Sequence, residues 1–240
     1  MGKLTLSPTI DQTYVIDHID DGSRDSFYFR HELELSRQQE KDRQFERACN
    51  TRFLAFQKLI ELMPDDETIA LEWENDECQA AIEIAYNSAI DHFLVGDWEM
   101  CAGQLELLLE LDPEDHMEAT IILAYAYIAM QEFESFDEVI NDVNDKYIDK
   151  AILTLWSEYR RTGKIVNGEL VYMRKHYPTY YAEFVADDHL ADEQYLADIS
   201  SERPSKEALA RELWFRTEHL WITFPGFIES LKQHHASLGR

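Results

Sequence analysis

Three side chains in the C-terminal part of the chain have the types and spacing that could bind a metal ion. His189 lies four residues before Glu193, with Asp192 between them, so one helical turn would present an imidazole and two carboxylates together. Such a set could activate a water molecule for hydrolysis. In a chain this acidic, however, a histidine beside carboxylates is expected by chance on a solvated face. A metal-dependent hydrolase is therefore an alternative function, and we assign no catalytic or metal-binding residue.

Other reactive side chains lack the neighbours that catalysis needs. No motif places a serine or cysteine nucleophile with His92, so we expect a core histidine there rather than a general base. Cys101 falls at a packing position and is expected to be buried and inert. The eight glycines are scattered and form no phosphate-binding loop. The sequence thus predicts a protein that is not an enzyme and needs no cofactor.

Composition limits the partners of the chain. Its 240 residues include 48 Asp and Glu against 22 Lys and Arg, which gives a formal net charge of −26. Such a negative field repels phosphate backbones and anionic lipid, so we expect neither nucleic acid nor membrane as a partner. The three cysteines form no paired motif, and neither a secretory signal nor a membrane-spanning stretch is evident. We predict an acidic, cytoplasmic protein.

The N-terminal segment predicts a small hairpin or an extended arm. Residues 13–19 are apolar and β-branched, Asp21-Gly22 suits a tight turn, and residues 26–29 are rich in aromatics. Two strands could pair across this turn. An extended arm packed on helices fits the same residues, so both interpretations stay open.

Capping residues predict where several helices begin and end. A helix over residues 77–95 is followed by Gly96, which suits the left-handed position after a helix, and by Asp97, which suits an N-cap. The two helices on either side should form a tight antiparallel hairpin. Asp112 before Pro113 predicts the start of a further helix, because proline is favoured in the first helical turn.

The same hairpin pattern recurs at a fixed offset. Trp98 and Phe133 are 35 positions apart, and so are Ala89 and Ala124. Small residues allow two helix backbones to approach, whereas the large rings fill the corner where each hairpin turns. Further pairs at this offset are Leu105 with Ile140 and Leu108 with Val143. The segment from Ile82 to Ile148 therefore predicts two copies of one helical unit.

These positions resemble the tetratricopeptide repeat (TPR) family, whose period is roughly 34 residues with small, large and proline positions in a fixed order. In the second copy the family's L-G-x₂-Y positions hold Leu123, Ala124 and Tyr127. In the first copy its small, small, large and proline positions hold Ala89, Cys101, Leu105 and Pro113. The resemblance covers residues 40–181, and Trp156 departs from it where a small residue is usual.

The resemblance implies an all-α fold, namely an antiparallel helix-hairpin, TPR-like superhelical array. We place this array at residues 37–178, after an N-terminal arm or small hairpin at residues 1–36 and before a helical C-terminal cap at residues 179–240. Atypical end segments suit such an array because its terminal apolar faces need covering. Within the cap, Pro204-Ser205 predicts a helix start with Ser205 as the N-cap.

In the TPR family the first helix of each pair lines a concave, peptide-binding groove. We select the apolar and aromatic residues at the corresponding positions of this sequence, together with one arginine that could meet an acidic ligand group. They are Tyr86, Ile90, Phe93, Ile121, Tyr125, Ile128, Leu153 and Arg160. The resemblance therefore implies a non-catalytic protein–protein interaction adaptor that holds a peptide or partner segment in an apolar concave groove.

Three alternatives to an open peptide groove stay open. The N- or C-terminal segment could fill the groove from within the same chain. The chain could also be a self-associating structural module, for which a homodimer is the simplest form. The third alternative is the metal-dependent hydrolase that would use His189, Asp192 and Glu193.

Overall fold

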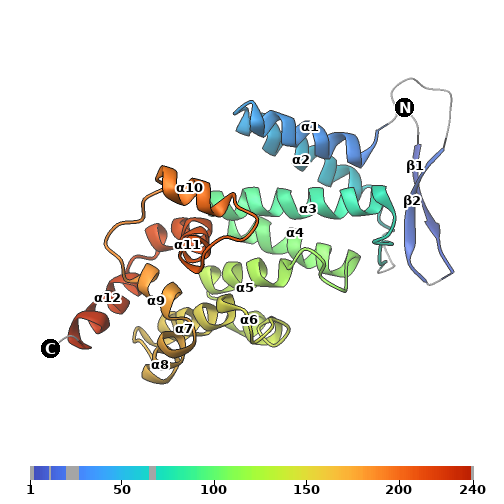
Figure 1. Ribbon diagram of the computed structural model, residues 1–240. Helices are drawn as coiled ribbons and strands as arrows, with labels where there is room; N and C mark the ends of the chain where they lie inside the picture. Colours follow the sequence, from blue (N-terminus) through green and yellow to red (C-terminus); the bar gives the residue numbers. More distant parts are fainter. Residues whose placement is uncertain (1–2, 11, 20–26, 65–68, 239–240) are drawn as a thin grey trace. The chain divides into compact units, whose positions relative to one another are not determined.

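The fold is mostly helical, as the sequence predicts. The computed structural model describes residues 3–10, 12–19, 27–64 and 69–238. These residues contain twelve helices and one two-stranded antiparallel sheet (Figure 1). The chain forms two compact units, Met1–Ala126 and Tyr127–Arg240, so the boundary falls within α5 (Ala119–Met130) and inside the predicted repeat segment. No helix in the described ranges is long and apolar enough to cross a bilayer.

A small hairpin begins the N-terminal unit, but its strands differ from those predicted. Strand β1 (Lys3–Pro8) pairs with β2 (Tyr14–Ile19), with Leu6 opposite Ile16. The predicted pairing of residues 13–19 with residues 26–29 is wrong, because Phe29 is fully buried and begins the first helix. The predicted Asp21-Gly22 turn lies outside the described residues.

Four helices complete most of the N-terminal unit and form two hairpins. They are α1 (Phe29–Lys41), α2 (Phe45–Ile60), α3 (Asp76–Val95) and α4 (Trp98–Leu111). Helix α3 is the centre of this unit, since it packs against α1, α2, α4 and strand β2 (Figure 1). Its first turn is capped by Asn75, whose side chain accepts hydrogen bonds from the backbone N–H groups of Glu77 and Cys78. The hairpin is tied to this helix where the backbone N–H of Ile16 donates to Cys78 Sγ at 3.3 Å.

The turns after α3 and α5 share one geometry. Gly96 has φ +80° and Gln131, 35 positions later, has φ +66°. In each turn this residue donates its backbone N–H to the carbonyl three positions earlier at 3.2 Å, and the next residue donates to the carbonyl five positions earlier at 2.9 Å. Asp97 also caps α4 as predicted, since its carboxylate accepts from the N–H of Met100. The offset found in the sequence is therefore repeated in the backbone of both turns.

The link between α4 and α5 corrects one predicted helix start. Helix α5 begins at Ala119 rather than at Pro113. The Asp112 carboxylate accepts from the backbone N–H of His116 at 2.8 Å and contacts its ring at 2.6 Å, so it stabilises a turn before the helix. The side chain of Asp115 caps the start of α5, because its carboxylate accepts a hydrogen bond from the backbone N–H of Ala119 at 2.6 Å.

The C-terminal unit contains helices of very different lengths around a tryptophan-rich core. After α5 these are α6 (Phe133–Val139), α7 (Ile148–Thr162), α8 (Asn167–His176), α9 (Pro178–Phe184), α10 (Glu193–Ile199), α11 (Lys206–Thr223) and α12 (Gly226–Leu238). Trp156 is fully buried and meets Trp221 edge to face, with ring centroids 5.2 Å apart. The large residue that departs from the repeat pattern is therefore a core residue. Ser205 caps α11 as predicted, since its hydroxyl accepts from the N–H of Ala208.

Replacing Gly96 should show how much the first hairpin turn depends on glycine. Gly96→Ala is expected to lower the free energy of unfolding by about 1–2 kcal/mol, because a side chain disfavours the left-handed conformation. The added Cβ would also touch the Trp98 ring at 3.4 Å. Gly103→Ala is the matched control: it lies in α4 with nothing within 4 Å of the new methyl group, and should stabilise by about 0.5–1 kcal/mol. Urea unfolding, monitored by circular dichroism, measures the free energy of unfolding of both variants. Equal effects of the two substitutions would contradict a specific need for glycine at position 96.

Candidate functional site

The structure divides the eight predicted groove residues into two groups. Five of them are buried, namely Phe93, Ile121, Tyr125, Ile128 and Leu153, whereas Tyr86, Ile90 and Arg160 are half-buried. The Phe93 ring packs against Tyr125, with centroids 6.3 Å apart, and edge to face against Trp98 at 5.5 Å. The buried side chains therefore form interior contacts, and contact with a partner falls to residues that keep exposed surface.

Arg160 is occupied by contacts within the C-terminal unit. Its guanidinium lies 4.1 Å above the centre of the Phe224 ring, and one of its N–H groups donates to the Ala129 carbonyl at 3.1 Å. Burial lowers the pKa of this guanidinium. These contacts join the C-terminal turn of α7 to its neighbours, so Arg160 has a structural role in addition to any role in binding.

An apolar cleft of about 260 Å³ opens between α2 and α3 of the N-terminal unit. Its walls include Cys49 and Phe53 from α2 and Ser88, Asp91, His92 and Val95 from α3. The spacing of these residues places each set on one face of its helix, since positions three, four and seven apart share a face. The cleft is therefore a surface that both helices build together.

A buried ion pair fixes the distance between α2 and α3 beside this cleft. The Arg52 side chain, 7% exposed, donates from Nε and from a terminal nitrogen to the two Asp91 carboxylate oxygens, both at 2.8 Å. Its other terminal nitrogen donates to Glu40 at 2.6 Å. Although burial opposes the charge, the hydrogen bonds that Arg52 donates to Asp91 and Glu40 raise the pKa of its guanidinium. Bidentate pairing also fixes orientation, so the cleft has a rigid base.

His92 and Cys49 are the reactive side chains of the cleft, and neither is prepared for catalysis. His92 Nδ1 lies 3.2 Å from the Asp97 carboxylate, and its ring meets Phe53 edge to face at 5.8 Å. Burial raises the pKa of the Cys49 thiol, and the nearby Asp91 charge raises it further. A thiol with a raised pKa is a poor nucleophile at neutral pH, because the thiolate is the reactive form.

Exposed apolar side chains lie on the two helices that form the cleft. Val95, at the end of α3, is 79% exposed, and Leu94 beside it is also exposed. On α2, Phe45 is exposed and lies one turn before Cys49. Leu54, further along the same helix, is also exposed. Single exposed apolar residues are common on protein surfaces, whereas four on two adjacent helices form a group that can mark an interaction site. The sequence could not distinguish them from core positions, because their spacing is equally that of an amphipathic helix.

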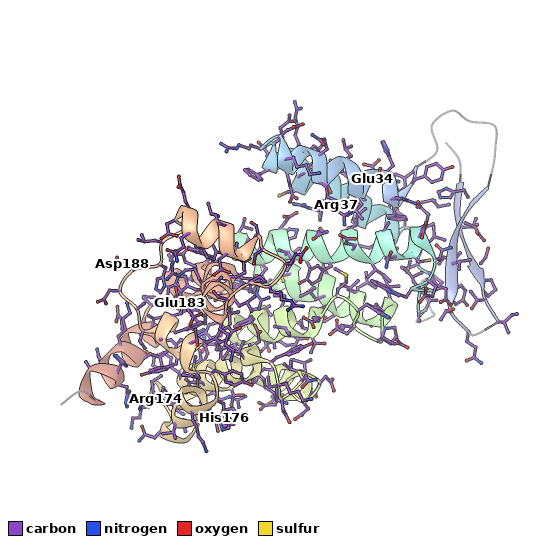
Figure 2. The ribbon with its side chains drawn as sticks, in the orientation of Figure 1. Glu34, Arg37, Arg174, His176, Glu183 and Asp188 are labelled. Carbon is purple, nitrogen blue, oxygen red and sulfur yellow. The ribbon has the colours of Figure 1, made fainter. Side chains whose placement is uncertain are left out.

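The predicted metal cluster is not assembled as a ligand set. His189 Nδ1 instead lies 2.8 Å from the carboxylate of Glu183, which Arg211 also contacts. Asp192 caps the start of α10, and Glu193 is exposed in its first turn. Within the described ranges, no three His, Cys, Asp or Glu side chains are grouped to hold a metal ion. The sequence did not identify Glu183 (labelled in Figure 2) as the partner of this histidine.

No family model matches the chain, and searches of curated proteins and of solved structures found no significant match. The resemblance to the TPR family therefore rests on the residues that carry it and on the geometry shared by the two hairpin turns.

The Arg52 ion pair should be a major determinant of stability in the N-terminal unit. Asp91→Ala is expected to cost about 3 kcal/mol, because it leaves a guanidinium buried without its main partner. Glu40→Ala should cost less than about 1 kcal/mol, since the Glu40 side chain is 43% exposed against 17% for Asp91. Urea unfolding measures the loss of unfolding free energy in each variant. A larger loss for Glu40→Ala would show that Glu40, and not Asp91, is the main partner of Arg52.

The three thiols should differ in reactivity. Burial raises the pKa of Cys78 to about 11 and that of Cys101 to about 12, and both are fully buried, as predicted for Cys101. In native protein at pH 8 we expect Ellman's reagent to modify Cys49 alone, more slowly than a free cysteine because its pKa is also raised. Cys49→Ser should abolish this native reaction. Rapid modification of two or three thiols without denaturant would disprove the expected burial.

Proposed function

We propose that this chain is a non-catalytic protein–protein interaction module that holds an apolar segment of a partner protein. The observation that supports this most is the α2–α3 cleft, which is apolar, lies beside the Arg52–Asp91 ion pair and has exposed Val95 in its wall. Phe45, Leu54 and Leu94 on the same two helices are also exposed. Withdrawing each large apolar side chain from water favours binding by about 1.5–3 kcal/mol. The half-buried groove residues Tyr86 and Ile90 lie on α3 and are part of the same proposal.

The interpretation as a TPR-like array that acts in the cytoplasm is part of this proposal. It is supported by the turns after α3 and α5, which share their hydrogen bonds at the offset of the predicted repeat. Cys49, Cys78 and Cys101 are free thiols, which fits a reducing compartment. An adaptor is favoured over an enzyme because the thiol in the cleft has a raised pKa and because His92 is held by Asp97.

The proposal leads to a comparison of two valine variants. Val95→Lys places a charge on the border of the cleft and should reduce capture of the specific partner from native lysate at least tenfold. Val171→Lys is the matched control, because Val171 is also an exposed valine (58%) but lies on α8 of the C-terminal unit. Capture is quantified by mass spectrometry, with circular dichroism to verify that both variants are folded.

A second readout connects capture to the cleft. The bound partner should slow the reaction of Cys49 with Ellman's reagent, because the thiol lies in the cleft wall. Identical capture by Val95→Lys and Val171→Lys, with unchanged Cys49 reactivity, would refute the proposed site. Light scattering at two protein concentrations tests whether the chain forms a homodimer. If it does, the captured partner is a second copy of the chain.

A further inference from the structure

A second apolar cleft lies within the C-terminal unit, between α11 and α12. Its volume is also about 260 Å³. The apolar part of its lining comes from Trp214, Trp221 and Ile222 of α11 and from Ile228 of α12. Two further lining residues, Asp187 and His189, flank Asp188, which is labelled in Figure 2.

The inner wall of this cleft is held in place by named contacts. Trp221 is buried, and its indole N–H donates to the Thr217 hydroxyl at 2.9 Å. The His189 ring stacks on Trp214 with centroids 3.7 Å apart and is itself held by Glu183 at 2.8 Å. The cleft is therefore formed before any ligand arrives, which lowers the entropy cost of binding.

At its edge the cleft presents an apolar side chain to water. Ile222 is 72% exposed, although it lies beside the two buried tryptophans of the same helix. A large aliphatic group in that position contributes to binding only when another apolar group covers it. The space is large enough for one large apolar side chain, such as leucine or phenylalanine.

The polar residues around the cleft are mainly acidic. Asp187, Glu218 and Glu229 supply three carboxylates, and Lys232 supplies one ammonium group. Lys232 Nζ lies 3.6 Å from the Asp187 carboxylate, so this cation is shared with one of the three. Glu218 and Glu229 lie on α11 and α12, one on each side of the cleft. The local charge has the same sign as the net charge of −26.

This combination selects the chemistry of the occupant. An anionic surface or an acidic peptide would be repelled by the rim and by the field of the whole chain. An entirely apolar segment would bury or crowd the carboxylates without providing partners for them. A segment with one large apolar side chain between lysine or arginine residues satisfies both the inner wall and the rim.

We propose that the α11–α12 cleft is a binding site for a cationic peptide segment. One leucine or phenylalanine of the segment enters against Ile222 and Ile228, and flanking cationic residues meet Glu218 and Glu229. This site is separate from the α2–α3 cleft, and it stands whether or not that cleft binds a partner.

The test uses the full chain and three short fluorescein-labelled peptides of equal length. The first has a central leucine flanked by lysines, the second has alanine in place of that leucine, and the third keeps the leucine but has glutamates in place of the lysines. Fluorescence anisotropy should show that the first peptide binds at least tenfold more tightly than either of the others. Ile222→Ser should weaken binding of the first peptide at least fivefold, because the residue is exposed and its loss leaves the inner wall unchanged.

A charge-matched control separates the rim from the general field of the chain. Glu229→Lys and Glu138→Lys change the net charge equally, but Glu138 lies on α6 and does not line the cleft. Glu229→Lys should weaken the first peptide at least fivefold, whereas Glu138→Lys should change its affinity less than twofold. Equal binding of the leucine and alanine peptides, tighter binding of the acidic peptide, or equal effects of the two glutamate variants would overturn the proposal. The variant Val95→Lys should bind the first peptide normally, so this result is independent of the α2–α3 cleft.

Discussion

The N-terminal unit is organised around one buried guanidinium. Arg52 projects from α2 into the contact with α3, where water cannot solvate its charge, and it must therefore be paired there. The two parallel hydrogen bonds to Asp91 satisfy the charge and also fix the rotation of one helix against the other. A neutral apolar contact would allow the helices to slide until the space beside them closed. Asp91 of this ion pair is also part of the wall of the cleft lined by Phe53 and His92.

The same use of arginine recurs in the C-terminal unit. Arg211 of α11 binds Glu183 of α9, and Arg216 of α11 binds the buried Asp149 of α7 at 2.8 Å. Arg52, Arg211 and Arg216 each bridge two helices, and an ion pair that is partly shielded from water is stronger than one in bulk solvent. With 48 Asp and Glu against 22 Lys and Arg, the chain carries a large excess of carboxylates. An apolar opening in such a surface has an acidic border, which determines the sign of charge that a partner must carry.

Two capping positions, Gly96 and Ser205, were determined locally by the sequence. Gly96 needs only its own left-handed conformation, and Ser205 needs only the N–H groups of the next turn, so both predictions were confirmed. The hairpin strands were not determined locally, because residues 14–19 have two possible neighbours in the chain. Burial of Phe29 at the start of α1 decides between them, and that burial depends on the packed helices.

The candidate sites were less predictable than the fold for a related reason. Helical periodicity identifies which residues share a face, but it does not identify which face another element covers. Tyr125 and Leu153 were expected in an open groove and are buried, whereas Val95 follows the same apolar pattern and is exposed. Their chemical types are alike, so only the packing distinguishes a core position from a binding position.

Rigid, partly apolar clefts are suited to reversible recognition rather than to chemistry. Catalysis requires groups whose charge or proton affinity changes along a reaction, and such groups need preorganised polar surroundings. In the α2–α3 cleft two polar groups already have partners, because Asp91 is bound to Arg52 and His92 Nδ1 lies 3.2 Å from the Asp97 carboxylate. The remaining free energy available to a ligand comes from apolar contact, which is strengthened when the walls lose little freedom on binding. The proposal of a binding surface therefore rests on apolar contact beside a fixed ion pair.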